Sequence, residues 1–317
     1  MSGNLLTPLK IVSRAPQNSL PKALDLFLLD CRSRRLAPKT VTFYETQLKP
    51  ALGFFESTGI TELAQVDPYT LRAYLVALQD RELKDNSIHA AARSLRVFFN
   101  FLVREELLAV SPMNKVRMPV RDKKVLPAFS LDEVNSLLEA VTGSVRDTAI
   151  VLCLLDSGLR AAEFVALDIA DIDSQTGAVK VRLGKGRKSR TSFLGNRAQK
   201  AVKKWLLARP EARQTEPLWT SSTTGERLTQ DGLRQLLQRI AARSEVPNCH
   251  PHTFRRTFAL WSLRAGMDLQ RLAGLLGHAD LSVLRQYLAL VETDLQEAHS
   301  LFGPVDSFTP EKRSKTR

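Results

Sequence analysis

The feature that most constrains the fold is a helical periodicity that continues over residues 20–110. Apolar residues recur there at three- and four-residue intervals, and no stretch alternates apolar with polar residues as a strand would. One helix is expected to start with Thr40 as its N-cap, and another with Asp67 as its N-cap. The pattern therefore predicts four helices, and it excludes a sheet in this part of the chain.

The last of these helices has an apolar side and a basic side. Ile88, Leu95 and Leu102 repeat on the first side, while arginines occupy the second. A helix face of this kind suits contact with phosphate groups. The bases that we expect to contact DNA, here and in the segments described below, are Arg93, Arg96, Arg104, Lys115, Arg117, Arg187 and Lys188.

Beyond residue 110 the pattern changes twice. Residues 111–128 are aperiodic, rich in proline and basic, which is typical of a linker. A capping box at Ser130 then starts a second run of helices, and residues 178–194 alternate as a short hairpin would. We expect a mainly α protein of two domains, with a helical domain at 18–110, that linker, an α-rich domain with a small antiparallel β-sheet at 129–303, and a basic tail at 304–317.

The charge of the chain indicates a polyanionic partner. Lysine and arginine number 46 against 33 acidic residues, a net charge of +13. Residues 1–128 hold 19 of these bases and 12 of the acids, so both halves are basic. Nucleic acid is the leading candidate and an anionic membrane surface the second. No apolar run is long enough for a signal peptide or a membrane span, so we expect a cytoplasmic protein.

Several kinds of chemistry have no sequence support. The chain has no Walker A loop, dinucleotide-binding glycine motif, HExxH or CxxC pair, and its three cysteines are too scattered for a disulfide framework. Zinc held by Cys249, His250, His252 and His278 is conceivable, but Pro251 constrains the pair and the spacing matches no known ligand pattern. We therefore expect neither a metal nor a cofactor.

A set of polar residues on otherwise apolar segments could instead bind and attack a phosphate. Arg255 follows His252 by three residues on one helix face, and Arg160 begins another helix. Two guanidinium groups beside a histidine would receive phosphate oxygens, but an ion pair from Arg160 to Glu163 is an equally good interpretation. The remaining candidates are Lys185, although a lone lysine in a glycine turn is normally solvated, His278, and Tyr287, which could be a core residue or a nucleophile.

The order of these residues resembles the tyrosine recombinases, or phage integrases, and most of all their short Xer-like members. The resemblance covers about residues 18–300. It rests on the stretches Ser157-Gly158-Leu159-Arg160-Ala161-Ala162-Glu163, Gly184-Lys185-Gly186, Pro251-His252-Thr253-Phe254-Arg255-Arg256, Leu276-Gly277-His278-Ala279-Asp280, and Tyr287. One departure is Arg256, because many relatives carry histidine at that place.

The resemblance implies a site-specific DNA recombinase that closes around double-stranded DNA as a clamp, with residues 18–110 as a SAM-like core-binding domain. Tyr287 would form a 3′-phosphotyrosyl link, and strand exchange would pass through a Holliday junction. Arg160, Arg255 and His278 would bind the phosphate. His252 would be the general base, and Lys185 the general acid, with Lys188 as its competitor.

The resemblance also implies a homo-tetramer on DNA, in which residues 292–301 would form a helix that docks on a neighbour, and it allows a second, partner recombinase. Two other functions stay open at this point. One is strand relaxation by a type IB topoisomerase-like enzyme, which shares the same chemistry. The other is a noncatalytic DNA-binding regulator, which an intact set of candidate catalytic residues disfavours.

Overall fold

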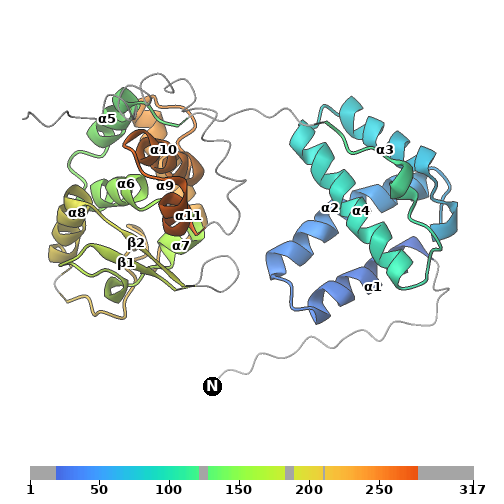
Figure 1. The fold of residues 1–317 in the computed structure, drawn as a ribbon, viewed down its shortest axis with the longest axis horizontal. Coiled ribbons are helices and arrows are strands. Elements are labelled where there is room, and N and C mark those ends of the chain that lie inside the picture. The colour runs from blue at the N-terminus through green and yellow to red at the C-terminus, as the bar shows by residue number, and fades with distance from the viewer. Residues whose placement is uncertain (1–18, 121–127, 183–188, 210, 278–317) are drawn as a thin grey trace, which may run out of the picture. The chain divides into compact units, whose positions relative to one another are not determined.

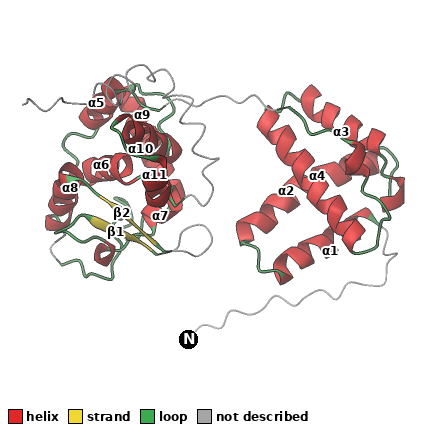
Figure 2. Ribbon diagram, in the orientation of Figure 1, coloured by secondary structure: helices red, strands yellow, loops and turns green. Residues whose placement is uncertain are grey.

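The chain folds into two compact helical units. The structure is a computed structural model that describes residues 19–120, 128–182, 189–209 and 211–277. The first unit ends at residue 124 and the second begins at residue 125, and among the described residues the only strands are one pair in the second unit (Figure 1; Figure 2). The predicted mainly α class with a small antiparallel sheet is thus confirmed. No described helix is long and apolar enough to cross a membrane.

Phe27 lies at the centre of the first unit. Its ring meets those of Tyr44, Phe98 and Phe101 nearly edge-on, at centroid distances between 5.2 and 5.6 Å. These rings join three helices into one core, and Arg93 stays exposed outside it. The unit's four α-helices are α1 (Leu20–Ser33), α2 (Pro38–Ser57), α3 (Pro68–Asp80) and α4 (Asp85–Arg104).

The starts of these helices follow local chemistry. Asp67 caps α3 as predicted, because its carboxylate accepts a hydrogen bond from the Thr70 backbone N–H at 2.7 Å. The prediction that Thr40 is the N-cap of the preceding helix, α2, is wrong. Helix α2 starts at Pro38 with Ala37 as its N-cap. Proline suits the first helical position, because its fixed φ is helical and the first N–H groups have no partner within the helix.

The segment expected to be a linker, residues 111–128, begins by packing on the first unit. It forms a 3-10 turn at Pro112–Lys115, and both Met113 and Val116 are buried in the helical core. Arg96 of α4 donates a hydrogen bond to the Val116 carbonyl at 3.1 Å. The first eight residues of this segment therefore belong to the helical unit.

The second unit is built around α6, which packs against α5, α8, α10 and β2. Ser130 and Glu133 form the predicted capping box at the start of α5. The elements of this unit are α5 (Leu131–Ala140), α6 (Val145–Ser157), α7 (Ala161–Val165), β1 (Ala178–Val181), β2 (Arg190–Phe193), α8 (Asn196–Leu207), α9 (Gln230–Ser244), α10 (Pro251–Arg264) and α11 (Leu269–Leu276).

The two strands form the predicted hairpin. They pair antiparallel, with Ala178 opposite Phe193 and Val181 opposite Arg190. Strand β2 contacts α11, so the hairpin lies beside the C-terminal end of the described chain (Figure 1). The position of Arg190 at the start of β2 therefore brings its long side chain within reach of α11.

Candidate active site

Two arginines from distant parts of the sequence meet at one backbone carbonyl. Arg255 of α10 donates to the Leu276 oxygen from Nη2 at 2.7 Å, and Arg160 donates to the same oxygen from Nη1 at 3.4 Å. Arg255 also donates from Nη1 to the Gly158 carbonyl at 2.6 Å. Because the two side chains share an acceptor atom, their guanidinium groups are immediate neighbours.

Gly158 makes this meeting possible. It ends α6 in the left-handed conformation at φ 60°, which turns the chain so that Arg160 begins α7. A Cβ atom at Gly158 would lie 2.5 Å from Cδ1 of Phe258, closer than real side chains come. Glycine therefore allows both the turn and the close approach of α10 to the backbone at residue 158.

Glu163 connects Arg160 to a third arginine. Its carboxylate accepts from Nη1 of Arg160 at 3.0 Å and from both Nη atoms of Arg190, at 2.8 and 2.7 Å. The ion pair from Arg160 to Glu163 is thus present alongside the pairing of the two arginines, so the two interpretations of Arg160 are compatible. Arg160, Glu163, Arg190 and Arg255 are referred to below as the Glu163 cluster.

The Glu163 carboxylate stays ionised although it is buried. Burial acts to raise its pKa, but the hydrogen bonds and charge of Arg190, together with the backbone and side-chain hydrogen bonds of Arg160, outweigh it and lower the pKa to about 2. Arg255 is also buried, with 6% of its surface exposed, whereas the Arg160 side chain keeps 26%. Three guanidinium groups against one carboxylate leave the cluster with an excess of positive charge, which suits an anion.

His252 stands one helical turn before Arg255, in the first turn of α10, and its side chain is exposed. Partial desolvation, followed by the charges of Arg255, Arg256 and Arg160, lowers its pKa below the ordinary 6.5. At neutral pH its imidazole is therefore uncharged. A neutral imidazole can accept a proton, as a general base must.

Several predicted site residues lie outside the described residues. They are Lys185, Arg187, Lys188, His278 and Tyr287, together with the helix expected at residues 292–301. The described chain stops at Gly277, directly before His278 in sequence, and the hairpin strands lie on either side of residues 183–188. Of the six predicted catalytic residues, the structure describes Arg160, His252 and Arg255.

The zinc hypothesis gains nothing from the cysteine. Cys249 is buried, and burial raises the pKa of its thiol to about 12, so it stays protonated. Within the described parts of the chain, no three His, Cys, Asp or Glu side chains gather as metal ligands would.

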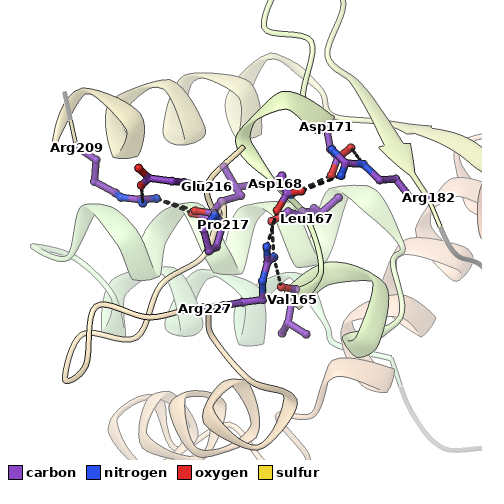
Figure 3. Close-up of polar contacts among 10 residues, drawn as sticks. Val165, Leu167, Asp168, Asp171, Arg182, Arg209, Glu216, Pro217 and Arg227 are labelled. Atoms are coloured by element: carbon purple, nitrogen blue, oxygen red, sulfur yellow. Dashed lines mark hydrogen bonds and ion pairs between the residues drawn. The ribbon is translucent and has the colours of Figure 1, made fainter. Parts of the chain in front are cut away.

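A second group of charged residues includes Arg182, which flanks the hairpin turn on the β1 side. Figure 3 shows Asp168 between Arg182 and Arg227, at 2.8 and 2.5 Å from their nitrogens. Arg182, which follows β1, also donates to Asp171 at 2.6 Å, and Arg227 donates to the Val165 and Leu167 carbonyls. These four side chains, Asp168, Asp171, Arg182 and Arg227, are referred to as the Asp168 cluster. Its two positive and two negative charges balance.

The bases predicted to contact DNA in the first unit differ in their surroundings. Arg93, Lys115 and Arg117 are exposed, and the Arg93 guanidinium lies over the Phe43 ring at 5.9 Å. Arg104 is exposed as well, but pairs with Asp30 at 3.2 Å. Arg96 is half-buried and holds the Val116 carbonyl, so part of its role is internal to the protein.

Arg190 is not among the site residues that the sequence predicted. The structure gives it an individual role, because its side chain spans from β2 to Glu163 and to the Leu275 carbonyl, which accepts from Nε at 2.9 Å. The only local signal was an arginine flanking a glycine turn, which does not identify its partners.

Two family models match the chain. The model of the phage integrase family matches residues 127–293, and that of the phage integrase N-terminal SAM-like domain matches residues 24–106. The chain is 31% identical to a tyrosine recombinase XerC of Oceanobacillus iheyensis, over 90% of this chain and 97% of that one. It is 34% identical to the XerC of Alcanivorax borkumensis, over 85% of this chain and 89% of that one.

Solved structures share the fold at lower identity. The Tn1549 transposon integrase in complex with a circular intermediate DNA has a TM-score of 0.71 at 15% identity, covering 85% of this chain and 94% of that one. A XerH site-specific recombinase bound to a palindromic difH substrate has a TM-score of 0.69 at 20% identity, covering 90% and 85%. A lambda integrase dimer bound to a core site has a TM-score of 0.69 at 19% identity, covering 85% and 95%.

Proposed function

The chain belongs to the phage integrase family, and from this premise we propose the chemistry that its residues perform. It is a tyrosine-type site-specific DNA recombinase, as are the XerC relatives by name. The reaction breaks and rejoins DNA strands through a 3′-phosphotyrosyl intermediate and a Holliday junction. The topoisomerase and regulator alternatives draw no support from these comparisons.

The observation that carries the proposal is the shared Leu276 carbonyl. It brings Arg160 and Arg255 together at one point, where a scissile phosphate would present two nonbridging oxygens. Forked guanidinium groups match this geometry and stabilise the negative charge that redistributes in the transition state. Their positive excess makes the site a receptor for the reacting phosphate, whereas the many surface bases serve the rest of the duplex.

The remaining roles follow the family pattern residue by residue. Tyr287 Oη attacks the phosphorus while its proton passes to His252, and the bond from phosphorus to the 5′ oxygen breaks. Lys185, with Lys188 as the alternative, protonates that leaving oxygen, and His278 assists in binding the phosphate. A new 5′-hydroxyl then attacks the phosphotyrosine in the reverse sense. Each phosphate ester is exchanged for another, so the chemistry needs no nucleotide.

Double-stranded DNA is the partner of this site. The structural neighbours include recombinases bound to DNA, and both units of this chain are basic. We assign phosphate contacts to Arg93, Arg104, Lys115 and Arg117 in the first unit and to Arg187 and Lys188 in the second. Arg96 contributes less, since it holds the Val116 carbonyl. A homo-tetramer, with or without a partner recombinase, would act on two sites in the cytoplasm.

The test is covalent trapping on a nicked suicide substrate in EDTA. Wild type should form a protein–DNA adduct through a 3′ phosphate, with Tyr287 in the modified peptide, whereas Tyr287→Phe should form none but still bind DNA. Tyr69→Phe is the matched control, because Tyr69 lies in the first unit and is 75% exposed. This variant should cleave DNA at the normal rate. An adduct through another residue, or cleavage that needs a divalent metal and leaves no protein attached, would exclude this mechanism.

A further inference from the structure

The Arg190 guanidinium binds the Glu163 carboxylate more completely than the Arg160 guanidinium does, although the Arg160 backbone N–H also donates to Oε2 at 2.9 Å. Both Nη atoms of Arg190 donate to it, one to each oxygen, while the Arg160 side chain donates to Oε1 alone, from Nη1. The Arg190 side chain is only 11% exposed and that of Glu163 only 4%. A bidentate pair in such surroundings is strong and fixed in orientation.

The surroundings of Arg190 are shaped to hold it there. Its Nε donates to the Leu275 carbonyl, which directly precedes the carbonyl shared by Arg160 and Arg255. Gly277, at φ 64°, passes so close that a Cβ atom on it would lie 2.9 Å from Cδ of Arg190. Arg190 is therefore packed against the backbone that carries the acceptor of the two phosphate-binding arginines.

We propose that Arg190 is a positioning residue that neutralises Glu163 and so keeps Arg160 available to the phosphate. This inference rests on the proposed function. Without Arg190, the ionised Glu163 would have Arg160 as its one remaining guanidinium partner in the Glu163 cluster. Arg160 already donates to it at 3.0 Å and could turn to bind both oxygens. The carboxylate would then reduce the positive charge that the reacting phosphate meets.

The other strand of the hairpin supplies a matched comparison at the same turn. Arg182 also makes two ion pairs, with Asp168 and Asp171, and it flanks the same turn in sequence (Figure 3). Its partners contact neither Arg160 nor Arg255 in any hydrogen bond of the described residues. Arg182→Gln thus removes a hairpin-end arginine and its ion pairs without exposing Glu163.

The experiment measures single-turnover cleavage of the suicide substrate at saturating DNA. Arg190→Gln should slow cleavage on the order of 10- to 100-fold, the value of a charge-assisted hydrogen-bonded pair, with DNA affinity unchanged. Arg182→Gln should slow it less than about threefold, because Arg182 is itself exposed and its partners contact neither phosphate-binding arginine. The decisive variant is Glu163→Gln combined with Arg190→Gln, which should cleave faster than Arg190→Gln alone because the carboxylate charge is gone.

A second comparison holds even where Arg190→Gln folds poorly. Once Glu163 is Gln, changing Arg190 to Gln as well should alter cleavage by less than about threefold, since little charge remains to neutralise. The fluorescence of Trp205, Trp219 and Trp261, all in the second unit, checks that each variant is folded.

Three results would overturn the inference. They are equal losses for Arg182→Gln and Arg190→Gln, no gain from removing the Glu163 charge, and recovery of Arg190→Gln on a 5′-thio substrate. The last result would show that Arg190 acts through protonation of the leaving group instead. If wild type forms no adduct, the proposed function itself has failed, and these comparisons among variants do not arise.

Discussion

The two arginine clusters of the second unit are built from the same types of side chain but differ in net charge. In the Glu163 cluster, Arg160 and Arg190 share one carboxylate, and Arg255 donates to the carbonyls of Gly158 and Leu276. In the Asp168 cluster, two arginines meet two carboxylates. The first keeps a positive excess in a mostly buried place, and the second is neutral.

This difference shows how the same residue type serves binding in one place and scaffolding in another. A carbonyl satisfies an arginine's hydrogen bonds without cancelling its charge, whereas a carboxylate does both. Arg255 is held by two carbonyls, so it can be fixed in place and still attract a phosphate. Arg182 is held by two carboxylates, so its positive charge is neutralised within the protein.

The largest expected effect separates the clusters by activity. Arg255→Gln should reduce cleavage by about 10³-fold, since losing a preorganised donor to the reacting phosphate costs 10²- to 10³-fold. Arg227→Gln is the matched control from the Asp168 cluster, because Arg227 also donates to two backbone carbonyls, and it should cleave at near the normal rate. The measurement is single-turnover cleavage with DNA binding determined separately. Equal losses in both variants would remove the functional distinction between the clusters.

The second largest expected effect is a loss of stability when the Asp168 cluster is disrupted. Asp168→Asn leaves Arg182 and Arg227 facing each other without the carboxylate between them, and should lower the free energy of unfolding by about 2 kcal/mol. Urea unfolding followed by tryptophan fluorescence reports the second unit. Asp231→Asn is the control, because its ion pair with Arg234 is exposed and should be worth little. If Asp168→Asn instead abolished cleavage while stability held, the Asp168 cluster would not be a scaffold.

The parts of the structure that the sequence predicted are those governed by neighbouring residues. Asp67 and Ser130 cap their helices because a side-chain oxygen reaches an N–H three residues ahead, and this spacing is visible in the sequence. Thr40 failed because a proline two residues earlier was a better start. Local rules thus gave the helices and the hairpin, with small errors at their ends.

The sequence predicted residues of the candidate site but not the hydrogen bonds that join them. Arg160 and Arg255 were chosen from their residue type and setting, and the family resemblance supplied their roles. Glu163 and Arg190 lie 27 residues apart and meet only because the hairpin folds beside α7, and no periodicity encodes that contact. The carbonyls of Gly158 and Leu276 are equally invisible, because every residue has one.

The smallest expected effect tests whether the arginines next to His252 in α10 lower the pKa of its imidazole. The charges of Arg255 and Arg256 help to lower its pKa, so removing the noncatalytic one, by Arg256→Gln, should raise that pKa toward the ordinary 6.5. A general base loses activity when it is protonated, so the fall in cleavage on the acid side should move to higher pH in this variant. Rates measured from pH 5 to pH 8 at constant ionic strength would show it. Arg182→Gln should leave the profile in place, because its charge is already balanced by Asp168 and Asp171. A profile that shifts equally in both variants, or in neither, would mean that the charge of Arg256 does not control the pKa of His252.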